Sequence, residues 1–534
     1  MNPAAPGAGT QTMVLIAFLV FVGVTLLLCV LVGPEGDETA DFYTANRTLT
    51  PFQNGLALSG DYISAATLLG TTGIVAVNGY DGVTLALSTA LSLGVLLLLA
   101  QPLRNAGRYT LGDVLALRAD GAAPRIAAAV VTLAVSLPFL VVQLSSAGTA
   151  TALMLGLTHS GVQQFCTVLV GMLMVCYTVL GGMKGTSLVQ IVKVVLTLGT
   201  VLVVVLSVLV RFHWDVDALL AAAAKGSGRA DAYLRPGLRF GDSAEGWLNF
   251  VGLHLTVVLG ASCMPHMIMR VNASPTGAAA RRSTRHAVGM VGAFCLAVVV
   301  LGLGAVALLG GRLISAVDPN GQAALLLLAG NLQGGTGTTA GGALFTAVAC
   351  AVFVTVLAVV AGITLAAAAA LAHDVAACAV RRGRMTQVAE VRAVRWSVGA
   401  VGAVGIALAV AAQGYNLQFL SSLAVTVAAS AVLPALVYSL FWSRYNRTGL
   451  LWTVYGGLLT SVGLQLFSPT VSGAPDALFP NVDFHWFPLQ MPGVVSVPAA
   501  FLLGWAATVR SRREDGEPGF HEVQTRTLLG ADAE

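Results

Sequence analysis

The stretch GLALSGDYISAATLLG, residues 55–70, places the carboxylate of Asp61 inside an apolar run that is long enough to enter a bilayer. Charged side chains within a spanning segment are costly, and those that are retained usually face a cavity, a partner or a transport path. Polar residues and glycine surround this carboxylate: Gly60, Tyr62, Ser64 and Thr67. An unwound helix that binds a cation and a small anion near the bilayer midplane needs these residue types. We interpret Asp61 as part of a substrate or coupling site; capping a broken helix or pairing with a buried neighbour is the structural alternative.

Further polar side chains lie in the apolar segment LPFLVVQLSSAGTAT. Small hydroxyl residues commonly join membrane helices, so packing is one interpretation of Ser145. Gln143 is bulkier and costlier to bury, and it is a candidate for lining the transport path beside Ser145. Tyr62 and Thr67 are candidates for substrate contact, and a gate and ordinary packing are both open for Tyr62.

The segment GASCMPHMIMR joins a helix-breaking Pro265 to His266 and Arg270. An imidazole titrates near physiological pH, so His266 is a candidate for proton coupling, with a satisfied structural histidine as the alternative. Arg270 is interpreted as a side chain that snorkels to the membrane interface, with steering of an anion as the alternative. Thr355 and Thr364, in a run of small apolar residues, either bond to their own helix or point into a site.

The composition predicts that membrane-spanning helices position these polar and charged side chains. The chain has 534 residues, of which 56% are hydrophobic and 10% charged, and its mean hydropathy is +0.83. An ordinary soluble protein is about a quarter charged, so this chain is predicted to be an all-α integral membrane protein. Thirteen segments are apolar and long enough to span as helices, near residues 12–33, 51–76, 81–101, 126–156, 160–180, 187–210, 244–268, 287–309, 341–372, 395–413, 416–441, 449–467 and 491–509.

The charge pattern predicts the topology. An odd number of spans places the termini on opposite sides, and 22 of the 28 Lys and Arg residues then lie in inner loops or in the tail. The positive-inside rule therefore favours a plasma-membrane protein with its N-terminus outside and its C-terminus in the cytoplasm. Lys193 is counted with the inner charges as a boundary case. The net charge of +4, without interleaved aromatic residues, does not indicate a nucleic-acid surface.

Enzymatic motifs are absent from the sequence. It contains no GxSxG, no HExxH and no phosphate-cradling Walker loop, so neither an enzyme nor a nucleotide-driven pump is predicted. The seven cysteines show no CxxC or His/Cys ligand spacing, and no cofactor is expected beyond a coupling ion, Na⁺ or H⁺.

Several stretches together resemble the sodium:solute symporter family, in particular its acetate and short-chain monocarboxylate permease branch. They are DFYTANRTLTPFQNGLALSGDYISAATLLG, GYDG, LRNAGRYTLGDVLALR, YTVLGGMKGTSLVQIVK, MPHMIMR and AVVAGITLAAAAALAHDV. The likeness runs in order over most of residues 38–445. It implies a LeuT-like fold of five-plus-five inverted repeats, whose first core helix is broken near Gly60 and Asp61.

The resemblance also implies a division of the chain. Residues 1–34 are an extra N-terminal transmembrane helix, and residues 35–445 form the transporter core, with repeats at 35–212 and 213–445. Residues 446–509 add two C-terminal helices. Residues 510–534 are expected to be a disordered cytoplasmic tail, because they are polar and charged.

In the family, Na⁺ is held by backbone carbonyls of the first core helix and by two adjacent hydroxyl residues of the eighth. The resemblance places the carbonyls at Gly60 and Ile63, with the Ser64 side chain close by. The hydroxyl positions fall on Ala358 and Val359, so only Thr355, one turn earlier, offers an oxygen. A further departure follows GGM, where many relatives carry an aspartate and this chain has Gln190.

These patterns predict a secondary symporter that imports acetate or a similar short-chain monocarboxylate with a cation. Na⁺ is slightly favoured on family grounds, and Asp61 is a candidate for the missing oxygen ligand to Na⁺. A proton taken up by Asp61 is the alternative, because burial raises the pKa of a carboxylic acid. Another organic solute, such as an amino acid or a vitamin acid, is the alternative substrate. A transporter-fold sensor and a passive channel are the alternatives outside symport. The expected partners are the carboxylate, the cation and the bilayer, and the sequence does not predict an oligomeric state.

Overall fold

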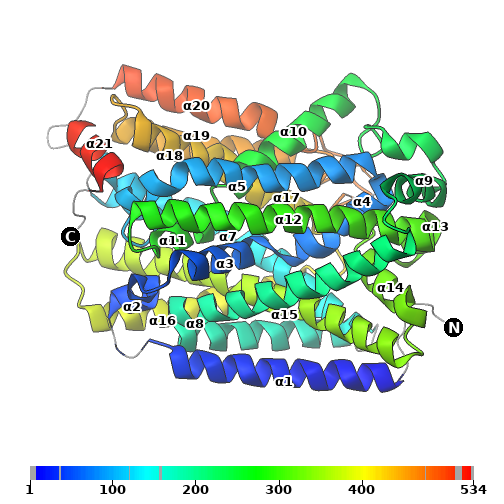
Figure 1. The fold of residues 1–534 in the computed structure, drawn as a ribbon. Coiled ribbons are helices and arrows are strands. Elements are labelled where there is room, and N and C mark those ends of the chain that lie inside the picture. The colour runs from blue at the N-terminus through cyan, green and yellow to red at the C-terminus, as the bar shows by residue number, and fades with distance from the viewer. Residues whose placement is uncertain are drawn as a thin grey trace.

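The computed structural model describes residues 8–34, 36, 38–119, 121–154, 159–474, 477–511 and 520–530. These residues form helices joined by turns and loops, and no named β-strand occurs among them. The long helices run side by side across the view in Figure 1. The prediction of an all-α bundle is confirmed.

The helices fall into long and short groups. The long helices are α1 (Ala8–Val32), α5 (Tyr80–Ala106), α7 (Ala122–Met154), α8 (Ser160–Arg211), α10 (Ala244–Ala261), α12 (Gly277–Leu309), α15 (Thr339–Ala369), α16 (Gln387–Ala411), α19 (Arg447–Leu466) and α20 (Gly493–Arg510). The short helices are α2 (Thr39–Thr44), α3 (Pro51–Tyr62), α4 (Thr72–Asn78), α6 (Leu111–Leu115), α9 (Val216–Ser227), α11 (Pro265–Asn272), α13 (Gly311–Val317), α14 (Ala324–Asn331), α17 (Gln418–Val427), α18 (Leu433–Phe441) and α21 (Phe520–Leu529). Wider π-helical turns occupy Ala66–Thr71, Ala370–Val380 and Ala428–Val432.

Eleven helical stretches of the described chain are long and apolar enough to cross a membrane. One of them, Gly161–Arg211, contains two of the thirteen predicted segments, and its backbone leaves the helical region at Gly182. The predicted segment 51–76 is interrupted, so neither half reaches the length of a span. These two features account for the difference between eleven and thirteen. The chain is a multi-pass membrane protein.

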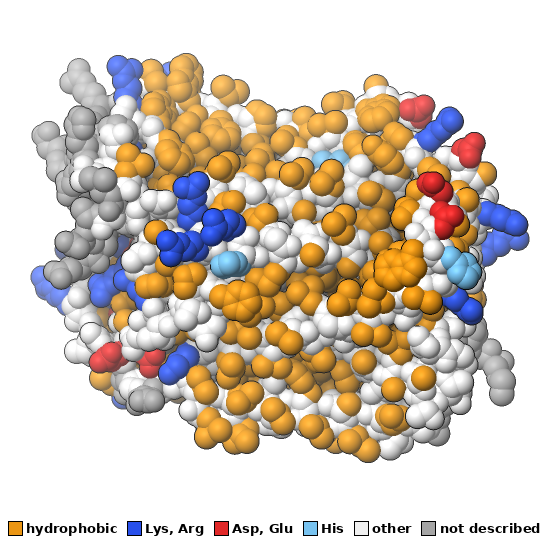
Figure 2. Space-filling model, viewed as in Figure 1, with side chains coloured by type: hydrophobic (Ala, Val, Ile, Leu, Met, Phe, Trp, Pro, Cys, Tyr) orange, Lys and Arg blue, Asp and Glu red, His pale blue; other side chains and the backbone are white. Residues whose placement is uncertain are grey.

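The outer surface of the bundle is apolar, as contact with lipid requires. Leu98 of α5, Leu296 of α12 and Leu502 of α20 expose 76%, 72% and 64% of their surface. Figure 2 shows hydrophobic side chains over the middle of the visible face, with Lys and Arg mostly toward its two ends.

α15 lies in the centre of the bundle. In its most apolar window 78% of the residues are buried, the largest share of any span in the described chain. Small side chains explain this position, because they allow neighbouring backbones to approach closely. At Gly362 an added Cβ would lie 2.7 Å from Asp61 Oδ1, so glycine there makes room for the carboxylate.

The C-terminal tail contains the helix α21. α21 packs against α5, where the Asn105 side chain donates to the Thr527 carbonyl (2.9 Å). The disorder expected for residues 510–534 stays a prediction. The segment 512–519 and residues 531–534 lie outside the described residues.

The kink in α8 provides a test of the fold. Gly182 has φ +50° and ψ −149°, a region that is strained for any residue with a Cβ. We expect Gly182→Ala to lower the unfolding free energy by about 1–3 kcal/mol. Thermal unfolding of the purified protein measures this effect. Gly199→Ala is the matched control on the same helix, because its Cβ would meet nothing within 4 Å. An equal effect in both variants would contradict a special role for Gly182.

Candidate functional site

The break after α3 frees backbone groups inside the bundle. α3 ends at Tyr62, and Ile63 is extended, with φ −74° and ψ 95°. The Ser64 N–H donates to the Thr67 hydroxyl (2.7 Å), and the Thr67 N–H donates to Ser64 Oγ (3.3 Å). These two side chains therefore cap the second half of the helix, in the manner of an N-cap. The break lies just after the position expected from the sequence, and it leaves the Gly60 carbonyl open to a donor from another helix.

Asp61 forms a buried ion pair with Arg270. Arg270 Nε donates to Asp61 Oδ2 at 2.7 Å, and the two side chains are 2% and 1% exposed. The guanidinium also donates to the Ser187 hydroxyl and contacts Met183 Sδ at 3.1 Å. The structural alternative for Asp61, pairing with a buried neighbour, is therefore part of its role. The carboxylate is held in place and is not open to solvent.

α8 contributes two further polar side chains. Gln190 Nε2 donates to Asp61 Oδ1 (2.5 Å) and to the Ala358 carbonyl (2.9 Å). The Lys193 ammonium donates to the Gly60 carbonyl and to Gln190 Oε1 (3.2 Å). Both side chains are fully buried. We name the connected side chains the Asp61 cluster: Asp61, Gln190, Lys193 and Arg270.

An ammonium group lies where Na⁺ was expected. The Gly60 carbonyl was one expected sodium ligand, and it accepts a hydrogen bond from Lys193. Two unit charges 4 Å apart repel by about 4 kcal/mol at an effective dielectric constant of 20. Sodium bound at this carbonyl would meet that repulsion while Lys193 is protonated. While the protonated Lys193 is hydrogen-bonded to the Gly60 carbonyl, this position does not fit Na⁺.

The hydroxyl side of the expected sodium site is also altered. Ala358 and Val359 carry no side-chain oxygen, and the Ala358 carbonyl accepts from α8. The Thr355 hydroxyl donates to the Ala351 carbonyl (2.6 Å) and lies 3.1 Å from the Thr197 hydroxyl. Thr355 therefore joins α15 to α8, and a sodium ligand at Thr355 stays a prediction.

Two further predicted residues make packing contacts. The Tyr62 hydroxyl donates to the Thr89 carbonyl (2.9 Å) and contacts the Ser92 hydroxyl, which joins α3 to α5. The Ser145 hydroxyl donates to the Ala409 carbonyl (3.2 Å), which joins α7 to α16. The contacts favour the packing interpretation for both side chains.

Gln143 and His266 lie where α7 and α11 meet. His266 stacks on Phe139 of α7, with ring centroids 6.1 Å apart. Gln143 follows Phe139 by one helical turn and so shares its face. It is 1% exposed, and neither atom of its amide has a hydrogen-bond partner in the described part of the chain. A buried polar group without a partner costs about 1–3 kcal/mol, so this side chain is suited to contact a ligand.

Sequence reasoning did not assign Lys193, Gln190 and Arg270 to the site. Placing Arg270 at the membrane interface was wrong, because its side chain is buried against Asp61. Counting Lys193 among the loop charges was wrong too, since none of its surface is exposed. A lysine within the apolar run 187–210 is the signal that could have revealed it, because intramembrane ionisable residues mark functional sites.

A second buried charge network joins α6, α7, α16 and the segment after α15. Arg125 Nη1 lies 2.5 Å from Asp113 and 3.1 Å from Asp374. His373 lies 2.7 Å from Glu390 and 3.2 Å from Asp113. Burial by itself would raise the pKa of Asp113, but His373 and Arg125 hold that pKa well below its usual range. Asp113 is therefore ionised at physiological pH and ties these helices together.

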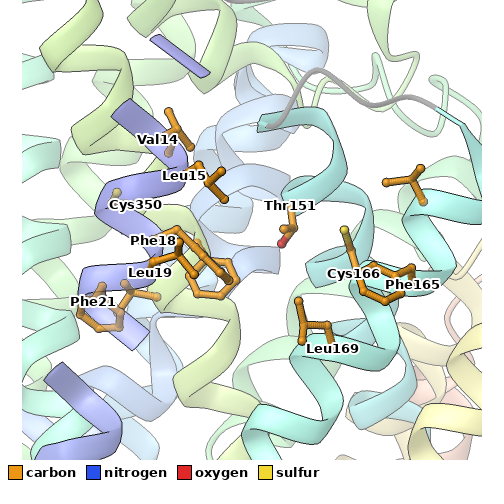
Figure 3. Close-up of a pocket in the computed structure, with 14 residues that line it drawn as sticks. Val14, Leu15, Phe18, Leu19, Phe21, Thr151, Phe165, Cys166, Leu169 and Cys350 are labelled. Atoms are coloured by element: carbon orange, nitrogen blue, oxygen red, sulfur yellow. The ribbon is translucent and has the colours of Figure 1, made fainter. Parts of the chain in front are cut away.

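An apolar cavity of about 260 Å³ lies between α1, α7, α8 and α15. Figure 3 shows Phe18, Leu19, Leu169 and Cys350 around it, with Thr151 nearby. No member of the Asp61 cluster lines this cavity. It offers no charged group to an anion and is distinct from the candidate site.

A broken helix within a bundle, with buried charges at the break, is typical of secondary transporters. The model of the sodium:solute symporter family matches residues 42–457, and the chain belongs to this family. It is a cation-coupled symporter for a small molecule and not an enzyme.

Relatives match over almost the full length. A monocarboxylic acid transporter of Corynebacterium glutamicum is 38% identical, with 100% of this chain and 98% of the relative covered. An uncharacterized symporter of Bacillus subtilis is 37% identical, with 97% and 98% covered.

Solved structures share the fold. A Na⁺-coupled sialic acid symporter, in a substrate-bound outward-open state, has a TM-score of 0.69 at 11% identity, with 94% of this chain and 98% of that chain covered. A nucleobase-cation-symport-1 transporter has a TM-score of 0.54 at 15% identity, with 92% and 98% covered. The LeuT-like architecture is confirmed.

The ion pair gives a second prediction. Asp61→Asn and Arg270→Gln each break the buried ion pair by removing one of its two partners, so each should lower the unfolding free energy by about 3–5 kcal/mol. The double variant should lose clearly less than the sum, because neither charge then remains. Thermal unfolding measures the cycle, with Arg282→Gln, an exposed arginine on α12, as the control. Additive losses would contradict a direct pairing.

Proposed function

We propose that the protein imports acetate or a similar short-chain monocarboxylate across the plasma membrane together with a cation. The relative in Corynebacterium glutamicum, a monocarboxylic acid transporter, supports the substrate class. Both Na⁺ and H⁺ are compatible with a cation-coupled symporter, and Na⁺ has the support of the family name.

The observation that carries this proposal is the charge balance of the Asp61 cluster. When ionised, the cluster holds two cations, Lys193 and Arg270, against one carboxylate, Asp61. A small anion that binds nearby compensates the remaining positive charge, whereas a neutral or cationic solute leaves it unbalanced in a buried site. An electrostatic preference for anions follows.

The unpartnered amide of Gln143 supports the same substrate class. Its N–H₂ group can donate to a carboxylate, and the neighbouring apolar surface of Phe139 suits a short alkyl group. An amino acid substrate would also need an acceptor for its ammonium group. Both oxygens of Asp61 already accept from Arg270 and Gln190, which favours a carboxylate without an amine.

The proposed orientation has the N-terminus outside and the C-terminus in the cytoplasm. It rests on the excess of Lys and Arg in the loops assigned to the inner side. The end of the bundle that carries α21 and the network around Asp113 would then face the cytoplasm.

Counterflow of labelled acetate in proteoliposomes tests the substrate class. Vesicles loaded with unlabelled acetate should take up labelled acetate above the level of protein-free liposomes, which correct for diffusion of acetic acid. Propionate and pyruvate should compete, and amino acids should not. Competition by amino acids, or uptake equal to that of empty liposomes, would contradict the proposal.

Gln143 provides a residue-level test. Gln143→Leu should raise the KM for acetate by about tenfold or more, because a hydrogen bond to a charged group contributes about 1.5–3 kcal/mol. Initial rates of uptake over a range of concentrations measure the KM. Ser145→Ala is the matched control on α7, since its hydroxyl binds the Ala409 carbonyl instead of facing a ligand. An unchanged KM in Gln143→Leu would exclude this contact.

A further inference from the structure

We propose that Lys193 binds the coupling proton and takes the place of sodium at the broken helix, so that the carboxylate moves with H⁺. This inference rests on the proposed function, and it identifies the coupling ion and the residue that carries it. Its basis is the position of the ammonium group on the Gly60 carbonyl, together with the loss of hydroxyl side chains at Ala358 and Val359.

The partners of Lys193 connect its charge to the helix break. A buried ammonium is tolerated only while oxygen acceptors replace the water it has lost. Lys193 has two such acceptors, the Gly60 carbonyl and Gln190 Oε1. The carbonyl is available because the helical hydrogen-bond pattern ends at Ile63 and Ser64. Any rearrangement of the helix break that moves this carbonyl away therefore lowers the affinity of the Lys193 amine for its proton.

The charged and titratable groups around Lys193 come from two helices. The carboxylate of Asp61 in α3 interacts electrostatically with the Lys193 ammonium. His266 of α11 interacts electrostatically with Asp61, Arg270 and Lys193. Asp61 accepts two hydrogen bonds through its two oxygens, and protonating it would break its pair with Arg270. Lys193 can gain or lose a proton while that pair stays intact. Asp61 is therefore the positioning group, and Lys193 is the carrier.

The proton balance of the cycle is simple. The neutral amine of Lys193 accepts one proton from the outer side, and the resulting ammonium donates to the Gly60 carbonyl and to Gln190. After the site has opened to the other side, the N–H bond breaks and the proton passes to water. One proton and one carboxylate cross together, so no net charge moves.

Uptake of labelled pyruvate, a more acidic and less membrane-permeant monocarboxylate, tests this inference. In sodium-free proteoliposomes an inward proton gradient should drive accumulation of about tenfold for each pH unit. A Na⁺ gradient, or a potassium diffusion potential set with valinomycin, should drive none. Accumulation that requires Na⁺ would overturn the inference.

Two variants test whether Lys193 carries the coupling proton. Lys193→Gln cannot carry a proton, and Lys193→Arg cannot release one, because a guanidinium stays charged in proteins. Both should lose accumulation driven by the proton gradient, and the ratio of that accumulation to counterflow should fall by about tenfold or more. Lys184→Gln, on the same helix, is the control. Full accumulation in Lys193→Gln would overturn the inference.

A measurement without substrate separates failure of this inference from failure of the proposed function. Exchange of K⁺ for Na⁺ at constant ionic strength should leave the thermal stability of the wild-type protein unchanged, because the ammonium already fills the site. Specific stabilisation by Na⁺ would overturn the inference even if the substrate were different. Absence of counterflow with both acetate and pyruvate would instead refute the proposed substrate class.

Discussion

The site depends on the pairing of Asp61 with Arg270 in the interior of the bundle. A single buried charge would be too costly, but a hydrogen-bonded pair is tolerated and holds its members in one geometry. This pair fixes Asp61 against Gln190, and Gln190 in turn orients Lys193 toward the helix break. The glycine at position 362 leaves room for the carboxylate between α3 and α15. A chain of polar contacts thus connects the three helices α3, α8 and α11.

At the helix break, where a cation was expected, the structure places the ammonium group of Lys193. A broken helix offers carbonyl oxygens to a positive charge, and it does not specify whether that charge is a metal ion or an ammonium group. Here a side chain from α8 supplies the charge, and the residues that would complete a sodium shell are alanine and valine. The family relationship therefore defines the architecture more firmly than it defines the coupling ion.

Much of the fold could be predicted from the sequence, because long apolar segments and glycine-flanked charges leave few alternatives in a bilayer. The glycine-flanked carboxylate indicated an unwound helix, and the resemblance to the symporter family implied a break near Gly60 and Asp61. The partners of Asp61 were not, since contacts between residues 61, 190, 193 and 270 are set by tertiary packing that no local pattern encodes. Arg270 looked like an interfacial residue because it ends an apolar segment. The packing roles of Tyr62 and Ser145 also depend on distant helices.

The most direct measurement of the central claim is a high-resolution experimental structure determined in a high concentration of Na⁺ with bound acetate. We expect density for the Lys193 ammonium within hydrogen-bonding distance of the Gly60 carbonyl, with no ion between Gly60, Ile63 and Thr355. An ion coordinated by those oxygens, with Lys193 turned away, would contradict it.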